Sequence, residues 1–94
     1  MFVVLLKFSE NKSKASEFME AHNKWIKSGF DDGVFLLAGS LQPKLGGSVI
    51  ANGVSRYELE NRVNEDPFVR ERVVSAEVLE ITPAKVDERL DFLT

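Results

Sequence analysis

The alternation of apolar and polar positions defines four short apolar runs and two amphipathic segments. The apolar runs, at residues 2–8, 34–41, 48–51 and 76–81, are bounded by turn-forming residues, which is typical of strands. The amphipathic segments begin near residues 13 and 55 and predict helices. The resulting βαββαβ order predicts a ferredoxin-like α+β fold, an antiparallel four-stranded sheet with both helices on one face.

The first amphipathic segment, residues 13–29, carries one polar side chain at the centre of its apolar stripe. At 100° per residue the stripe forms a narrow arc with Trp25 at its edge, and its members are Ala15, Phe18, Met19, His22 and Ile26. His22 is the chain's only histidine. A buried imidazole needs a hydrogen-bond partner, and its charge changes near neutral pH. His22 is therefore either a core histidine bonded to a backbone carbonyl or a functional group.

Turn and cap residues predict where the helices begin and end. Either Asn11 or Ser13 can cap the first helix, which we expect to end near Gly29. Residues 55–58 read Ser-Arg-Tyr-Glu, a capping box that starts the second helix. Residues 85–93 form a short amphipathic tail that we expect to be helical. The chain therefore reads as a single domain over 1–94, with a C-terminal extension from about residue 84.

Residues 2–6 and 34–38 are apolar on both faces of their predicted strands. Helices cover only one face of a ferredoxin-like sheet, so its strands should alternate apolar and polar positions. A strand that is apolar on both faces is covered on both faces. The sequence therefore predicts a homodimer joined by face-to-face packing of two sheets. The alternative is that the C-terminal tail folds back over its own sheet.

Composition and charge exclude several classes of function. The chain has 94 residues and a net charge of −3, and no face concentrates Lys and Arg, so we expect no nucleic-acid partner. No apolar run approaches the roughly 20 residues of a membrane span, and the N-terminus lacks the features of a signal peptide, so we expect a cytoplasmic protein. The chain has no cysteine, and one histidine with carboxylates is a poor zinc set, so we expect no metal.

Asp66 is the candidate partner that would turn His22 into a site. A general base usually needs a second group that fixes its tautomer. Both helices of a ferredoxin-like domain lie on the same sheet face, so His22 and Asp66 can approach each other. Asp66 precedes Pro67, and this pair is also expected to cap and restart the second helix. The two roles are compatible because a carboxylate has lone pairs to spare.

Four further residues are candidates for contacts with a small molecule. Ser40 ends the second predicted strand, and its hydroxyl is either a ligand contact or an ordinary polar strand end. Gly46 and Gly47 permit positive φ and close approach of a ligand, or else form a tight loop before the third strand. Phe68 either lines a pocket or belongs to the core. The sequence contains neither a nucleotide-binding glycine motif nor a nucleophile elbow, so we expect no cofactor.

The order of these motifs resembles the YciI-like (YCII-related) family. The resemblance spans residues 2 to about 83 and rests on His22 with Trp25, on 37–41, on Gly46-Gly47, on 66–68 and on 76–81. It implies a dimeric α+β barrel and a His–Asp pair in a pocket at His22 and Asp66, with Ser40 close by. The chain departs from the family pattern at Ser40, where a proline often stands, and in its tail beyond Pro83.

The resemblance implies a small enzyme. One branch of the family acts on chlorinated hydroxylated aromatics, and muconolactone isomerase-like relatives suggest proton transfer on cyclic or enolic compounds. We therefore expect a cofactor-free lyase or isomerase in which His22 is the general acid/base and Asp66 orients it and stabilises its charge. One alternative is a non-catalytic dimer that binds a small ligand through the same pair. Another is that the pair only locks the two helices together.

Overall fold

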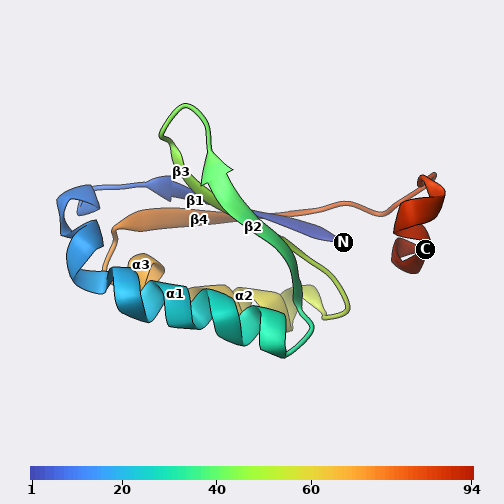
Figure 1. Cartoon of the computed structure of the whole chain (residues 1–94), viewed down its shortest axis with the longest axis horizontal. Helices are drawn as coiled ribbons and strands as arrows, with labels where there is room; N and C mark the ends of the chain where they lie inside the picture. The colour runs from blue at the N-terminus through green and yellow to red at the C-terminus, as the bar shows by residue number, and fades with distance from the viewer.

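The computed structural model describes all 94 residues and contains one antiparallel sheet with the strand order β2-β3-β1-β4. The strands are β1 (Phe2–Phe8), β2 (Phe35–Leu41), β3 (Gly46–Ala51) and β4 (Val74–Glu80). The helices α1 (Ala15–Asp31), α2 (Arg56–Asn64) and α3 (Pro67–Arg70) lie together on one side of the sheet (Figure 1). The order βαββαβ confirms the predicted ferredoxin-like α+β fold.

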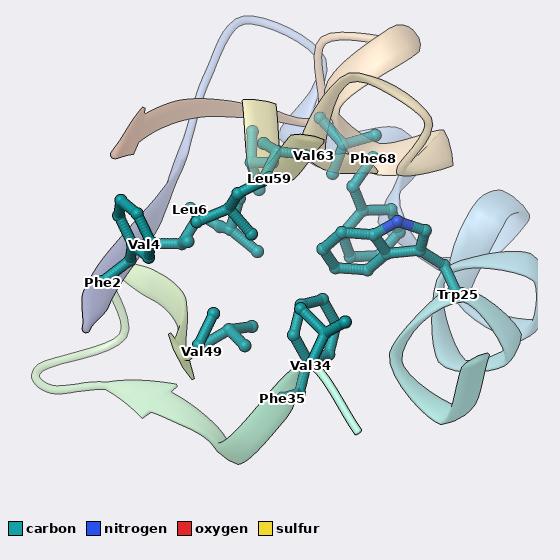
Figure 2. Packing of buried hydrophobic residues seen from close by; sticks show 13 residues of the cluster. Phe2, Val4, Leu6, Trp25, Val34, Phe35, Val49, Leu59, Val63 and Phe68 are labelled. Atoms are coloured by element: carbon teal, nitrogen blue, oxygen red, sulfur yellow. The ribbon is translucent and has the colours of Figure 1, made fainter. Parts of the chain in front are cut away.

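The core lies between the sheet and these helices, and β1 runs through its middle. Alternate residues of β1, including Val4 and Leu6, are buried on the helix side. Val4 pairs with Val49 of β3 and Val78 of β4, so these neighbours point to the same side. The buried cluster also contains Trp25 from α1, Leu59 and Val63 from α2, and Phe68 from the start of α3 (Figure 2). Burying a leucine such as Leu59 contributes about 1.5–3 kcal/mol.

The start of α1 differs from the predicted cap. A 3-10 turn, η1 (Lys12–Lys14), precedes the helix, and neither Asn11 nor Ser13 caps it through a side chain. The Asn11 amide instead donates to the carbonyl oxygen of Glu71 at 2.9 Å, which ties η1 to the segment before β4. The predicted cap is therefore wrong, because a contact 60 residues away takes the side chain.

The end of α1 lies at Asp31, two residues beyond the predicted end at Gly29. Gly29 is buried inside the helix, where a Cβ atom would lie only 2.1 Å from the ring of Phe35. The glycine therefore allows α1 to pack closely on β2 and does not stop the helix. Gly33, with φ +72°, makes the turn that follows.

β3 begins at Gly46 and not at Ser48, so both glycines belong to the sheet and the predicted loop is shorter. Gly46 has φ +133°, and a Cβ atom on it would lie 2.0 Å from the carbonyl oxygen of Leu6. Close approach of two strands therefore requires glycine here. β4 also begins two residues earlier than predicted, at Val74, because a tight turn with Arg72 at φ 58° ends the preceding helix.

The predicted caps of the later helices are confirmed. Ser55 accepts a hydrogen bond from the Glu58 amide at 3.1 Å and donates to the Glu58 carboxylate at 3.0 Å. Asp66 accepts from the Phe68 amide at 3.0 Å, and Pro67 occupies the first position of α3. These local hydrogen bonds place Asp66 at the break between α2 and α3.

The side of the sheet opposite the helices is uncovered and carries an apolar patch. The strand register places six aliphatic residues on this open face, together with Lys7, Ser48, Ser75 and Glu77; the aliphatic residues are Val3, Leu5, Leu37, Leu41, Ile50 and Leu79. Leu37 is 55% exposed and Leu79 is 43% exposed. The tail ends in a 3-10 segment, η2 (Glu88–Leu93), that lies beyond the C-terminal end of β4 and away from the sheet (Figure 1). The alternative in which the tail covers its own sheet is therefore wrong.

None of the helices combines the length and the apolar character that crossing a membrane requires.

Candidate active site between α1 and the sheet

A cavity of about 340 Å³ lies between α1 and the helix-facing side of the sheet. Its walls are mostly apolar and include Leu6, Phe8, Met19, Ile26 and Phe68. Pockets of this size bind small molecules, and a mainly apolar wall with a few polar groups fixes their orientation. The cavity is therefore the candidate site, and its polar groups decide what it does.

The predicted partners His22 and Asp66 are in contact at this cavity. His22 Nδ1 lies 2.7 Å from Asp66 Oδ1, and the carboxylate is fully buried. An ionised carboxylate only accepts hydrogen bonds, so Nδ1 carries the proton of this bond. The other ring nitrogen, Nε2, makes no hydrogen bond within the protein and is not sealed from solvent. Since His22 lines the cavity, Nε2 is available to a molecule bound there.

Aromatic neighbours hold the imidazole of His22 in one orientation. The Phe68 ring stacks on it with centroids 3.9 Å apart and an interplanar angle of 4°. The Trp25 ring lies 5.9 Å away at 25°, and its Nε1 donates to the carbonyl oxygen of Arg62 at 2.8 Å. Residues 66–68 therefore supply the acceptor for Nδ1 and the stacking ring from consecutive positions. Packing and hydrogen bonding thus fix which nitrogen faces the cavity.

One oxygen of Asp66 has no hydrogen-bond partner. Oδ1 accepts from both His22 Nδ1 and the Phe68 amide, whereas Oδ2 is buried and unpaired. A buried acceptor without a partner costs about 1–3 kcal/mol. A cap alone does not need a buried carboxylate, because an exposed serine caps α2. The carboxylate is therefore kept against a local cost to stability, which is common at functional sites.

The structure brings the other predicted contact residues to the same cavity. Ser40, Gly46, Gly47 and Phe68 all line it together with His22. Ser40 pairs with Gly47 on the helix-facing side of the sheet, and its hydroxyl makes no hydrogen bond within the protein. A glycine at position 46 is also required by the structure, because its backbone closely approaches that of Leu6. Phe68 belongs both to the core and to the cavity wall.

Asn23 also lines the cavity, although it is not one of the residues of the predicted apolar stripe of α1. Its amide makes no hydrogen bond within the protein. Ser48 lines the cavity too, but its hydroxyl already donates to the carbonyl oxygen of Val4 at 2.8 Å. The polar groups left free for a ligand are therefore His22 Nε2, the Ser40 hydroxyl and the Asn23 amide. No cluster of three or more His, Asp or Glu side chains is arranged to hold a metal ion.

Comparison with known proteins identifies relatives of this fold. The family model of the YCII-related domain matches residues 1–85. No curated protein matches the sequence. A solved structure of 5-chloro-2-hydroxyhydroquinone dehydrochlorinase from Burkholderia phenoliruptrix, in complex with 2,5-dihydroxybenzoquinone, is similar with a TM-score of 0.69. The match has 14% sequence identity and covers 86% of this chain and 93% of that chain, so the likeness is one of fold.

Proposed function

The chain belongs to the YCII-related domain family, whose model covers residues 1–85, and we propose that it is a small cofactor-free enzyme. In this proposal His22 and Asp66 form a general acid/base pair that acts on a small cyclic, enolic or phenolic compound. One observation carries the proposal. His22 Nδ1 is bonded to a buried carboxylate at 2.7 Å, while its Nε2 is open to a mostly apolar cavity.

The chemistry of the pair is a proton transfer at His22 Nε2. This nitrogen accepts a proton from an acidic O–H or C–H of the bound compound. The imidazolium that forms is stabilised by the Asp66 carboxylate, which already holds its Nδ1–H. If the proton returns to a different atom, the reaction is an isomerisation. If a leaving group departs with its bonding electrons and the proton passes to water, the reaction is an elimination.

The similar dehydrochlorinase supports the class of compound. The ligand of that protein, 2,5-dihydroxybenzoquinone, is a flat ring that carries two carbonyl and two enolic hydroxyl groups. A ring of this kind suits a cavity with aromatic walls and few polar groups. Phenols and enols of this ring type carry the acidic O–H groups on which an acid/base pair acts.

The test measures proton transfer directly by NMR, as deuterium uptake into the ring C–H positions of resorcinol, a phenol that is uncharged at neutral pH, in D₂O. Wild type should exceed the buffer rate, and His22→Gln should fall to it while ligand binding, followed by thermal shift, persists. Lys24→Gln, two residues further along α1 on its exposed side, is the matched control and should behave as wild type. Binding without faster exchange would favour the non-catalytic binding protein. The absence of both would refute the assignment.

We also propose that two copies pair through the open face defined above. Five of its aliphatic residues come from all four strands and occupy adjacent register positions that no segment of the same chain covers; they are Val3, Leu5, Leu37, Ile50 and Leu79. A monomeric protein rarely leaves a large continuous apolar patch in water. Face-to-face packing of two sheets buries such surfaces. The cavity lies on the opposite side of the sheet, so this pairing leaves its opening free.

A further inference from the structure

The cavity has an unusual balance of charge for a site that handles acidic compounds. Apart from His22, every residue that lines it has an uncharged side chain. Asp66, the ionised group in contact with His22, lies behind the imidazole and is fully buried. An anion that enters the cavity gives up part of its hydration and meets an imidazole that carries no charge, because it is the proton acceptor of the proposed reaction. Burial of an unpaired charge is strongly unfavourable.

The cations nearby do not supply the missing charge. Lys24 and Lys27 lie on the exposed side of α1 and each pairs with an acidic residue one turn away. The hydrogen bond to Asp31, together with the charge of this carboxylate, raises the pKa of Lys27. Lys12 places its ammonium 4.6 Å from the centroid of the Phe8 ring and does not line the cavity. An anionic ligand therefore finds no lysine on the cavity wall.

Two neutral polar side chains, both solvent-exposed, line the same cavity. The Ser40 hydroxyl comes from β2 and the Asn23 amide from α1, and neither makes a hydrogen bond within the protein. Both groups can donate and accept hydrogen bonds. They suit a carbonyl or hydroxyl oxygen on a ring whose other oxygen or acidic hydrogen faces His22 Nε2.

We propose that the cavity selects uncharged ring compounds over their anions, and that Ser40 and Asn23 bind a second oxygen of the substrate. This inference rests on the proposed function and narrows its substrate class. The substrate enters with its acidic proton in place, and the negative charge first appears when His22 has become an imidazolium beside it. The attraction between the two charges thus arises during the reaction and not on entry.

A pair of matched probes tests the charge selection. 4-Hydroxybenzamide and 4-hydroxybenzoate share a ring, a phenol and nearly the same shape, but only the second is an anion at neutral pH. Titration calorimetry on wild type should give a dissociation constant at least about tenfold lower for the amide. Equal or tighter binding of 4-hydroxybenzoate would overturn the inference, and so would a failure of both probes to bind at millimolar concentration.

A charge placed on the cavity wall should reverse this preference. Met19→Lys adds an ammonium at a lining position, so 4-hydroxybenzoate should then bind more tightly than 4-hydroxybenzamide. Ser28→Lys adds the same charge at an exposed position of α1 outside the cavity and should keep the wild-type ratio. If Ser28→Lys reverses the preference as fully as Met19→Lys does, the effect comes from net charge and the inference fails.

The second-oxygen contact has its own measurement. Asn23→Leu and Ser40→Ala should each weaken binding of 4-hydroxybenzamide by about two- to tenfold, which is the usual effect of one lost hydrogen bond. Unchanged binding in both variants would remove these residues from the site. Charge selection is an equilibrium property, so His22→Gln should retain it even if wild type fails to catalyse deuterium exchange. His22-dependent exchange with equal binding of amide and acid would refute only this inference.

Discussion

Asp66 uses a single oxygen to accept two hydrogen bonds, and Asp66→Ala removes both. Loss of the bond from the Phe68 amide uncaps α3, which costs about 1 kcal/mol. Loss of the bond from His22 Nδ1 leaves a buried donor without an acceptor, which costs about 1–3 kcal/mol. Removal of the unpaired Oδ2 offsets part of this. We therefore expect Asp66→Ala to lower the free energy of unfolding by about 2–3 kcal/mol.

Ser55→Ala is the matched control because Ser55 caps α2 without contacting His22. It should lose only the cap, about 1 kcal/mol. Asp66→Asn keeps a capping oxygen and an acceptor for His22 Nδ1, so it should lower the free energy of unfolding less than Asp66→Ala does. Urea denaturation followed by far-UV circular dichroism measures all three, and the dependence of the unfolding free energy on urea should stay unchanged.

The reasoning is refuted if Asp66→Ala loses no more stability than Ser55→Ala. A double-mutant cycle with His22→Leu gives a second criterion. The bond of 2.7 Å predicts a coupling energy above about 0.5 kcal/mol between the two positions. Additive losses would mean that the contact contributes nothing to the folded state.

Three further predictions concern the sheet and the tail. In sedimentation equilibrium, wild type should have about twice the 10.6 kDa mass of one chain, and a monomeric mass would exclude the dimer. Leu79→Glu on the open face should make the protein monomeric, whereas Tyr57→Glu at an exposed position of α2 should leave it dimeric. In urea, Gly46→Ala should lose clearly more stability than Gly53→Ala, since both have positive φ but only Gly46 lacks room for a Cβ atom; equal losses would contradict the crowding argument. Deletion of 84–94 should leave the thermal midpoint within about 2 °C of wild type, because the last backbone hydrogen bonds that tie the C-terminal part of the chain to its N-terminus join Ile81 to Met1.

The fold was predictable because its signals are local. The short apolar runs of the strands and the apolar stripe of α1 depend on neighbouring residues. So do the caps at Ser55 and Asp66, whose hydrogen bonds reach only two or three positions. The cap at Asn11 and the start of β3 at Gly46 were not predictable in this way. Asn11 bonds to Glu71, and Gly46 is fitted to the backbone of Leu6, so both depend on contacts between distant segments.

The sequence was enough to predict that His22 and Asp66 can meet, but not what replacing His22 does to stability or which further residues line the cavity. The approach of His22 and Asp66 follows from two helices on one sheet face, although 44 residues separate them. From the helix alone, leucine would pack well at position 22. The structure changes this expectation, because His22→Leu leaves the buried carboxylate with only the Phe68 amide. Asn23 escaped prediction because the shape of a cavity depends on where α1 leaves the sheet uncovered.

The stacking of aromatic rings around His22 gives the site an optical reporter. Trp25 is the only tryptophan of the chain, and its ring centroid lies 5.9 Å from that of the imidazole. An excited indole passes an electron to a nearby imidazolium far more readily than to neutral imidazole, and this quenches its emission. If His22 accepts a proton as proposed, the emission of Trp25 falls, and stopped-flow mixing of the unlabelled protein with a ligand records that step.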